Sequence, residues 1–466
     1  MEYVNDKLEE FNNYLVGRKV AIIGLGVSNL PLLDYLHANN AIVKIFDEKD
    51  IDNIPNEIMD KVTKYSMEFS LGKNCLSELK GFDLIFRSPS CLPTRAELVE
   101  EENRGAIVTT EIELLMKMCP CPVIGITGSD GKTTTTTLIY KILKNAGYNC
   151  FLGGNIGIPL FTKLNEMTPE DFVVLELSSF QLMGMQVSPQ ISVITNITPN
   201  HLNIHKDYEE YIDSKKNIFR YHDKGGTLIL NYDNVITRAC ESEANGNVIF
   251  FSSKEKLDNG YIVDEDIIKE CDDKVRKHIL DTKQLLIKGK HNYENICAAI
   301  AATKDLVPIE KAVQTIKEFT GVEHRIELVR TIDNVRWYND SASSSPTRTL
   351  SALNAFDEEI ILIAGGYDKK LDYEPLAKPI IDKVKALILI GQTSEKIFNA
   401  VKNELDLEHK YMDIYQCDTL EQTVQIANKI AKPNQVVIFS PASASFDMFK
   451  NFADRGNQFK NLVNNL

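Results

Sequence analysis

The sequence predicts an α/β protein of three domains, and two observations lead to this fold class. The chain has 466 residues, which is about three times the size of a common domain. Short apolar runs rich in β-branched residues alternate with helix-like segments, a pattern typical of parallel sheets because two parallel strands need a crossover between them. We expect domains at residues 1–112, 113–320 and 321–466, with a mainly parallel central sheet.

The first stretch contains a predicted strand–helix–strand unit with a glycine turn after its first strand. The two strands of this unit are expected at residues 19–24 and 41–47, and another short strand follows at residues 83–87. The spacing of Thr94 and Glu97 matches a capping box. It therefore predicts a helix that begins there and ends at Gly105.

The second and third stretches continue the alternation. Strands of the second are expected at residues 122–127, 172–176, 191–196, 227–231 and 248–251. Strands of the third are expected at residues 335–338, 359–364, 386–390 and 435–440. Between them, the charged run 253–283 is expected to be a surface excursion and the Ala-rich run 292–303 a helix.

Charge and cysteine content narrow the function classes. The formal net charge is −14, which argues against a general nucleic-acid binder because phosphate neutralisation needs clustered Lys and Arg. The N-terminus has no signal-peptide pattern, and no apolar run reaches the roughly 18 residues of a membrane span, so we expect a cytoplasmic protein. The nine cysteines are scattered, in keeping with reduced thiols. Cys119 and Cys121 have no second pair at metal-ligand spacing, and we expect them to be packing residues.

Residues 127–134 read Thr-Gly-Ser-Asp-Gly-Lys-Thr-Thr, between an apolar strand and a helix. Glycines let backbone N–H groups turn toward phosphate oxygens, and the helix N-terminus adds partial positive charge. The segment therefore predicts a phosphate-binding loop for ATP, although Ile126 stands where the usual first glycine would be. Lys132 is expected to reach the β- and γ-phosphates, and Thr133 to hold Mg²⁺. The predicted ATP contacts in the loop are Gly128, Ser129, Asp130, Gly131, Lys132, Thr133 and Thr134.

A candidate metal ligand follows the next predicted strand. Glu176 stands at its carboxyl end, where ligands bind in parallel sheets, and Mg²⁺ prefers oxygen ligands. A plain polar strand end is the alternative reading. Taken alone, His201 is typical of a surface or packed residue, and Lys215 of a solvated lysine whose charge would repel a metal.

Further motifs follow the loop in a specific order along the chain. They are Gly154-Asn-Ile-Gly157, Leu175-Glu-Leu-Ser-Ser-Phe-Gln-Leu182, His291-Asn-Tyr-Glu-Asn295, His324-Arg325, Asn339-Asp-Ser341, Gly365-Gly-Tyr-Asp-Lys369, Ser440-Pro-Ala-Ser-Ala-Ser445 and Phe449-Lys-Asn-Phe-Ala-Asp-Arg-Gly-Asn457. Read together, they resemble the Mur ligases of bacterial cell-wall synthesis over essentially the whole chain. The resemblance implies a Rossmann-like N-terminal domain for a UDP-sugar, a central P-loop ATPase domain and a Rossmann-like C-terminal domain for an amino acid.

The resemblance also implies a reaction of peptidoglycan synthesis, and hence a part in cell shape and division. Lys369 and the motif at 449–457 favour members that add D-glutamate to UDP-N-acetylmuramoyl-L-alanine. In that reaction ATP phosphorylates the substrate carboxylate, and the amine of D-glutamate then attacks the acyl phosphate, leaving ADP and phosphate. We expect a monomer with small-molecule substrates, ATP and two Mg²⁺ ions, and no nucleic acid.

Site residues carry over from the resemblance position by position. Glu176 resembles a ligand of the first Mg²⁺ and His201 a ligand of the second. Lys215 resembles the family's carbamylated lysine, whose carboxylate removes the charge objection, and the spacing from Tyr211 favours it over Lys216. The expected metal ligands are Thr133, Glu176, His201 and Lys215, and the expected catalytic residues are Lys132, Asn155, His201 and Lys215. Further expected contacts are Asn292, Asn295, Arg325 and Asp340 for ATP, Val27, Ser28, Asp47 and Asn155 for the UDP-sugar, and Lys369, Ser445 and Phe452 for D-glutamate.

Two positions depart from the family pattern. Ala342 stands where many members have a lysine, which weakens one expected D-glutamate contact, and Arg348 is a candidate substitute. Ser90 replaces the usual glycine of the loop beside the UDP-sugar. Three alternatives stay open. The first is a related ligase that adds another amino acid such as L-alanine, or a folylpolyglutamate synthase. The second is a dinucleotide-binding redox protein, suggested by the weak Gly-x-Gly pattern at residues 24–26, and the third is a nucleotide-gated binding module without catalysis.

Overall fold

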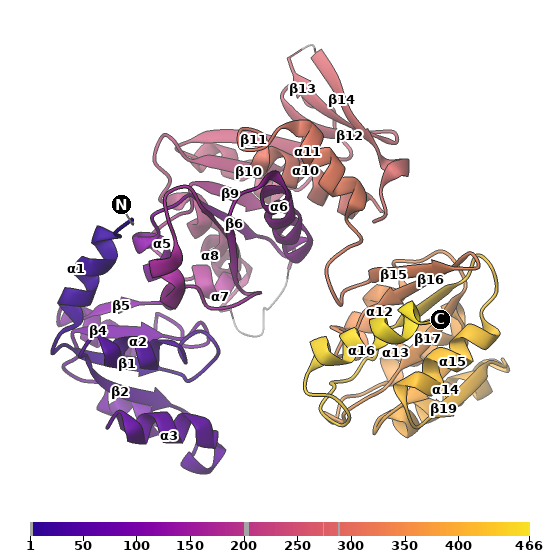
Figure 1. Cartoon of the computed structure of the whole chain (residues 1–466), viewed down its shortest axis with the longest axis horizontal. Coiled ribbons are helices and arrows are strands. Elements are labelled where there is room, and N and C mark those ends of the chain that lie inside the picture. Colours follow the sequence, from indigo (N-terminus) through magenta and orange to yellow (C-terminus); the bar gives the residue numbers. More distant parts are fainter. Residues whose placement is uncertain (1–2, 200–204, 274, 288) are drawn as a thin grey trace. The chain divides into compact units, whose positions relative to one another are not determined.

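The computed structural model describes residues 3–199, 205–273, 275–287 and 289–466, without the side chain of Glu57. The chain divides into two compact units, Met1–Lys317 and Glu318–Leu466. Two sheets belong to the first unit and one to the second (Figure 1). Within the described ranges, none of the helices is long and apolar enough to cross a membrane.

The N-terminal sheet is five-stranded and parallel, in the order β3-β2-β1-β4-β5. Its strands β1 and β4 are inner ones, and their apolar residues are buried because helices cover both faces. The strands are β1 (Lys19–Ile23), β2 (Ile42–Asp47), β3 (Glu68–Leu71), β4 (Leu84–Arg87) and β5 (Ile107–Thr109). The helices are α1 (Asp6–Leu15), α2 (Leu32–Ala38), α3 (Asn56–Lys64) and α4 (Ala96–Asn103).

The start of α4 differs from the sequence prediction. Arg95 occupies the N-cap position and no side chain caps the helix. Glu97 instead forms an ion pair with Arg95, with 3.3 Å between Nη2 and Oε1. The predicted capping box at Thr94 is therefore wrong, because the glutamate side chain is attracted to the neighbouring cation.

The central sheet has nine strands in the order β14-β13-β12-β11-β10-β9-β6-β8-β7. The strands are β6 (Val123–Thr127), β7 (Cys150–Gly154), β8 (Phe172–Glu176), β9 (Ile191–Ile194), β10 (Thr227–Asn231), β11 (Asn247–Ser252), β12 (Gly260–Asp264), β13 (Ile267–Asp272) and β14 (Val275–Asp281). The helices are α5 (Glu111–Met118), α6 (Lys132–Ala146), α7 (Ser179–Leu182), α8 (Tyr208–Arg220), α9 (Val235–Ala239), α10 (Lys290–Thr303) and α11 (Ile309–Glu318). The sheet is parallel from β7 to β12 and antiparallel at β12–β13 and β13–β14.

The charged run 253–283 was expected to be a surface excursion, and this expectation is wrong. The run forms β12, β13 and β14, which extend the central sheet. Ile262, Ile268 and Leu280 are buried on these strands, while charged residues alternate with them. Because antiparallel strands can leave one face in water, they do not need the continuous apolar runs of the inner strands.

The third sheet, in the second unit, has six strands in the order β15-β16-β20-β17-β18-β19, with only the β15–β16 pair antiparallel. The strands are β15 (Glu327–Ile332), β16 (Val335–Asn339), β17 (Ile360–Ala364), β18 (Val384–Ile390), β19 (Asp413–Cys417) and β20 (Val436–Phe439). The helices are α12 (Pro346–Leu353), α13 (Glu374–Lys383), α14 (Ser394–Glu408), α15 (Leu420–Ile430) and α16 (Phe452–Asn464). The three mainly parallel sheets confirm the predicted α/β fold class, while the domain boundaries at 112 and 321 stay predictions.

Candidate functional site

The loop between β6 and α6 has a backbone that only glycine fits at two positions. Gly128 has φ 149° and Gly131 has φ 79°. A Cβ on Gly128 would lie 1.9 Å from the Thr195 hydroxyl oxygen, and one on Gly131 would lie 2.3 Å from Oδ1 of Asn295. The loop therefore combines left-handed glycines with the N-terminus of a long helix, an arrangement suited to binding phosphate.

Neighbouring segments hold the loop in this conformation. The Ser129 N–H donates to the Asn196 carbonyl at 2.9 Å, and the hydroxyls of Ser129 and Tyr211 lie 2.9 Å apart. The Asp130 N–H donates to Oδ1 of Asn196 at 2.9 Å. Lys132 folds over the loop, with Nζ donating to the carbonyls of Gly128 at 2.9 Å and Ser129 at 2.8 Å. These contacts fix the shape of the loop before an anion binds, so binding requires little further ordering.

Glu176 lies at the carboxyl end of β8, beside the loop strand β6. Its side chain is 1% exposed, and Oε1 accepts a hydrogen bond from the Asn155 amide at 2.8 Å. Oε2 is buried and has no hydrogen-bond partner among the described residues. Because a buried carboxylate oxygen without a partner is costly, this oxygen fits a bound cation.

Lys215, on α8, points at the same loop although it is only 1% exposed. Its Nζ donates to the Gly128 carbonyl at 2.8 Å and lies 3.2 Å from the Thr127 hydroxyl. Burial, followed by the charge of Lys132, holds the pKa of Lys215 well below its ordinary value. A low pKa favours the neutral amine, which is the form that reacts with CO₂ to give a carbamate.

Of the two remaining predicted metal ligands, the structure describes Thr133 but not His201. Thr133 is half-buried in the first turn of α6, and His201 lies outside the described residues. Within the described part of the chain, no group of three or more His, Cys, Asp or Glu side chains is arranged to hold a metal ion. A cation here would therefore depend on Glu176, the Thr133 hydroxyl and a modified Lys215.

A pocket of about 510 Å³ adjoins Asn155. Residues that follow strands of both sheets line it: Val27, Ser28, Pro89 and Ser90 from the N-terminal sheet, and residues 154–159, Ser178, Phe180 and Gln181 from the central sheet. Asp47 does not line this pocket: its carboxylate accepts from the backbone N–H groups of Leu25 at 2.8 Å and Lys49 at 3.0 Å. Asp47 thereby holds the loop after β1, next to Val27 and Ser28.

Two further predicted ATP residues, Asn292 and Asn295, lie on α10, which packs against α6. Asn295 is buried, and its Oδ1 accepts from the Thr135 hydroxyl at 3.3 Å. Since the same oxygen faces Gly131, α10 supports the phosphate loop from its side.

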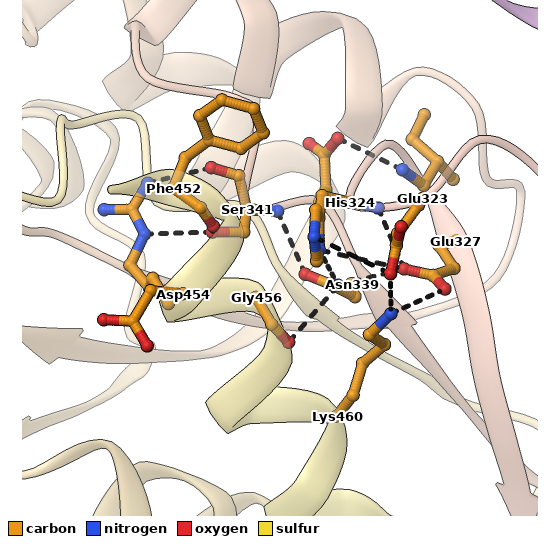
Figure 2. Close-up of polar contacts among 12 residues, drawn as sticks. Glu323, His324, Glu327, Asn339, Ser341, Phe452, Asp454, Gly456 and Lys460 are labelled. Atoms are coloured by element: carbon orange, nitrogen blue, oxygen red, sulfur yellow. Dashed lines mark hydrogen bonds and ion pairs between the residues drawn. The ribbon is translucent and has the colours of Figure 1, made fainter. Parts of the chain in front are cut away.

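In the second unit, the turn at His324 and Arg325 is fixed by a polar cluster (Figure 2). His324 has φ 63°, and its Nδ1 lies 2.9 Å from the amide nitrogen of Asn339. Glu327 accepts from the His324 N–H at 2.8 Å and from Lys460 Nζ at 3.2 Å. These contacts orient the backbone from which the Arg325 side chain extends.

Asp340 follows Asn339 at the end of β16 and is 1% exposed. It accepts hydrogen bonds from the Ser440 hydroxyl at 2.6 Å and the Ile326 N–H at 3.2 Å. Burial raises the pKa of Asp340 to about 6. The carboxylate thus joins the His324–Arg325 turn to the end of β20.

The three predicted D-glutamate residues lie on adjoining segments of the second unit. The loop carrying Lys369 meets the segment before Ser445 through the Tyr367 N–H, which donates to the Ala444 carbonyl at 2.9 Å. Ser445 is buried, and Phe452 begins α16 with its ring half exposed. Lys369 Nζ lies 5.9 Å from the ring centre of Phe446. A cation, a hydroxyl and an aromatic ring are thus carried by segments that contact one another.

Comparison with known proteins decides the family. The chain is 47% identical to the UDP-N-acetylmuramoylalanine--D-glutamate ligase of Acetivibrio thermocellus, over 99% of this chain and 100% of the relative. It is 46% identical to the ligase of the same name from Clostridium tetani, with the same coverage. This chain belongs to the Mur ligase family. Its residues 18–110 match the Mur ligase MurD-like N-terminal domain, residues 126–303 the Mur ligase middle domain, and residues 324–443 the Mur ligase glutamate ligase domain.

Solved structures agree on the Mur ligase fold. A UDP-N-acetylmuramate-alanine ligase from Thermotoga maritima aligns over 96% of this chain and 99% of its own, with a TM-score of 0.54 and 17% identity. The MurF ligase of Thermotoga maritima, solved in complex with ADP, aligns over 98% of this chain and 97% of its own, with a TM-score of 0.51 and 17% identity.

Two buried charged residues of this Mur ligase were not predicted from the sequence. Glu111 lines the pocket beside Asn155 and is 3% exposed. Burial raises its pKa to about 7, although it accepts from the N–H groups of Leu160 and Phe161. Arg455, on α16, is 1% exposed and donates to the carbonyls of Ser341 at 2.8 Å and Ala444 at 2.8 Å. Arg455 lies within the motif at 449–457, but no role was predicted for either residue, because their partners are backbone groups of distant segments.

Proposed function

We propose that this Mur ligase joins D-glutamate to UDP-N-acetylmuramoyl-L-alanine in peptidoglycan synthesis, with ATP converted to ADP and phosphate. The observation that carries the proposal is the full-length similarity, at 47% and 46% identity, to ligases named for this reaction. The fixed phosphate loop beside the unpartnered oxygen of Glu176 supports it, because ATP-driven carboxylate activation needs both.

The first step transfers the γ-phosphoryl group of ATP to the substrate carboxylate. A carboxylate oxygen attacks phosphorus, the bond to the ADP oxygen breaks, and an acyl phosphate forms. Residues 128–134 hold the triphosphate, with Lys132 moving from its present carbonyl contacts to the β- and γ-phosphates. Asn292 and Asn295 on α10 support the nucleotide side of the loop. Negative charge is spread over the phosphoryl oxygens during this transfer. Fixed N–H donors and the Lys132 ammonium stabilise that charge.

Thr133, Glu176, carbamylated Lys215 and His201 would hold two Mg²⁺ ions. When bound, the ions neutralise phosphate charge during the transfer. Asn155 keeps the Glu176 carboxylate in a single orientation. Formation of the carbamate on Lys215 would break the hydrogen bond that the amine now donates to the Gly128 carbonyl.

In the second step, the amine nitrogen of D-glutamate attacks the acyl carbon, loses a proton, and the tetrahedral intermediate expels phosphate. Lys369 and Ser445 offer a cation and a hydroxyl to the carboxylates of D-glutamate, and Phe452 packs on its side chain. Arg325 and Asp340 contribute to the nucleotide site, Arg325 through a planar fork suited to phosphate. Val27, Ser28, Asp47 and Asn155 serve the UDP-sugar. We propose that the enzyme acts in the cytoplasm as a monomer.

Phosphate release from ATP tests the proposal. The enzyme is assayed with UDP-N-acetylmuramoyl-L-alanine and D-glutamate, and in parallel with L-glutamate, L-alanine or glycine. Release that requires both the UDP-sugar and D-glutamate is expected. Release with another amino acid would instead assign a related ligase and point to Ala342 and Ser90 as the positions that changed the substrate.

A further inference from the structure

Two cysteine sulfur atoms lie close together where α5 passes into β6. Cys119 follows the last residue of α5, and the chain bends at Pro120 and Cys121 before β6 begins at Val123. The bend leaves 3.4 Å between the two Sγ atoms, and Sγ of Cys119 also lies 3.4 Å from the Cys121 carbonyl oxygen. The pair stands at the entry of β6, whereas the phosphate loop follows its exit, so the proposed ligase chemistry does not use it.

The two sulfur atoms differ in their surroundings. Cys121 is 3% exposed, while Cys119 is only half-buried. The hydrogen bond from Cys121 and, to a lesser degree, the charge of Lys7 lower the pKa of Cys119. Lys7 is held there because its Nζ donates to the Lys117 carbonyl at 3.4 Å. A less buried cysteine with a lowered pKa next to a second, buried cysteine is the arrangement of an attacking and a resolving cysteine.

The other cysteines do not share this arrangement. All nine are reduced thiols. Within the described ranges, the Cys119–Cys121 contact is the only hydrogen bond between two sulfur atoms. Cys417, for example, is also half-buried, but lies at the end of β19 in the second unit. Accessibility alone therefore does not distinguish Cys119, and its neighbouring sulfur does.

We propose that Cys119 and Cys121 form a redox-active dithiol, which a hydroperoxide oxidises to an intrachain disulfide. The Cys119 thiolate attacks the terminal peroxide oxygen, the O–O bond breaks, and a sulfenic acid forms while the leaving oxygen takes a proton. The Cys121 sulfur then attacks the sulfenic sulfur, the S–O bond breaks, and the leaving hydroxide takes the Cys121 proton to form one water. With hydrogen peroxide, two thiols and one peroxide give one disulfide and two waters. The sulfur atoms are already in van der Waals contact at 3.4 Å, and the bond brings them to about 2.05 Å.

Mass spectrometry of the full-length protein tests the proposal directly. The reduced protein is treated with one equivalent of hydrogen peroxide, denatured, alkylated with a light reagent, reduced, and alkylated again with a heavy one. Cleavage after Lys117 and Lys132 releases residues 118–132, which contain Cys119 and Cys121 and no other cysteine. We expect two heavy labels on this peptide and a fall in free thiols from nine to seven, which is nine minus two.

Variants separate this mechanism from unspecific oxidation. Cys121→Ser should stop at the sulfenic acid of Cys119, which dimedone traps. Cys417→Ser is the matched control and should leave the doubly heavy peptide unchanged. Three results would each overturn the proposal. The first is light labels on residues 118–132 after other thiols have been oxidised. The others are oxidation of Cys119 to the sulfinic acid in the unaltered chain, and disulfides between two chains.

Discussion

The side-chain amide of Asn155 donates a hydrogen bond of 2.8 Å to Oε1 of Glu176. The backbone N–H of Asn155 also donates to the Glu176 carbonyl at 2.8 Å. The two residues are thus joined twice at the carboxyl ends of β7 and β8. The carboxylate keeps one orientation, with Oε2 buried and without a hydrogen-bond partner in the described part of the chain. A pre-oriented oxygen of this kind is suited to ligating a cation.

Asn155→Ala should therefore weaken the response to Mg²⁺. Loss of a group that orients a metal ligand typically costs about 10–100-fold in metal affinity or activity, and we expect the Mg²⁺ concentration for half-maximal phosphate release to rise in this range. Asn149→Ala is the matched control, because Asn149 makes a similar bond of 3.1 Å to Asp171 away from the loop. Equal effects of both variants would contradict the role of Asn155.

If Lys215 is a modified metal ligand, Lys215→Gln should lower the rate of phosphate release roughly 100-fold or more. Lys216→Gln is the control, because Lys216 forms an ion pair of 2.5 Å with Glu243 instead of facing the loop. Removal of CO₂ should lower the activity of the unaltered enzyme, and bicarbonate should restore it. Carbon-13 NMR with labelled bicarbonate should show a carbamate that Lys215→Gln lacks. Full activity without CO₂ would argue that Lys215 acts as an amine.

The sheets could be predicted because buried parallel strands leave a strong signal. β6, β8 and β17 are buried along their whole length and appear in the sequence as continuous apolar runs. β12, β13 and β14 were missed because their half-exposed faces carry charges, which hide a period-two pattern in a charged segment. Burial on two faces, rather than strand formation itself, is what the sequence reveals.

The pH dependence of stability should reveal Glu111. Its folded-state pKa is raised from 4.5 to about 7 by burial. Between these values the folded state holds more protons than the unfolded state, so stability falls as pH rises through this window. The difference corresponds to about 3 kcal/mol of unfolding free energy above pH 7.

Glu111→Gln removes this titration while keeping an acceptor for the N–H groups of Leu160 and Phe161. Its advantage in unfolding free energy over the unaltered chain should therefore grow between about pH 5 and about pH 8. Urea unfolding at several pH values measures the difference. An advantage that stays constant with pH would show that Glu111 is ionised in the fold throughout.

Arg348→Ala should raise the KM for D-glutamate if Arg348 replaces the lysine missing at Ala342. The guanidinium donates to the Ala342 carbonyl at 3.1 Å and is exposed to solvent. Loss of one charge-assisted hydrogen bond corresponds to roughly a tenfold change, with little effect on kcat. Arg336→Ala is the control, because Arg336 on β16 pairs with Glu358 instead of facing the Ala342 segment. An unchanged KM would leave the Ala342 departure without compensation.

Parts of the candidate site were predictable for a different reason from the sheets. The phosphate loop requires glycine at Gly128 and Gly131, where the backbone φ is positive and other atoms approach closely. Such a constraint can be recognised in the sequence, because it requires glycine at fixed spacing. The motif at 449–457 contains Arg455 but does not show its role, because Arg455 binds the carbonyls of Ser341 and Ala444, and only the folded chain brings these together.

Gly456→Ala should destabilise the second unit although alanine is the better helix residue by about 1 kcal/mol. Gly456 lies within α16, and a Cβ there would stand 2.2 Å from Nδ1 of His324. The ring is 5% exposed, bonded to Asn339 at 2.9 Å and set edge-on to Phe452, with 6.0 Å between ring centres (Figure 2). Because the ring is buried and hydrogen-bonded, moving it is costly, and we expect a net loss of about 1–3 kcal/mol from overpacking.

His324→Ala in the same chain removes the ring and leaves room for the new methyl group. The double variant should therefore be more stable than the sum of the single effects predicts, with a coupling of about 0.5–3 kcal/mol in thermal or urea unfolding.

Gly456→Ala alone should also raise the KM for ATP, because displacement of the His324 ring shifts the turn that carries Arg325. Strictly additive effects would mean that α16 yields instead of the ring, and that the turn at Arg325 does not depend on this contact.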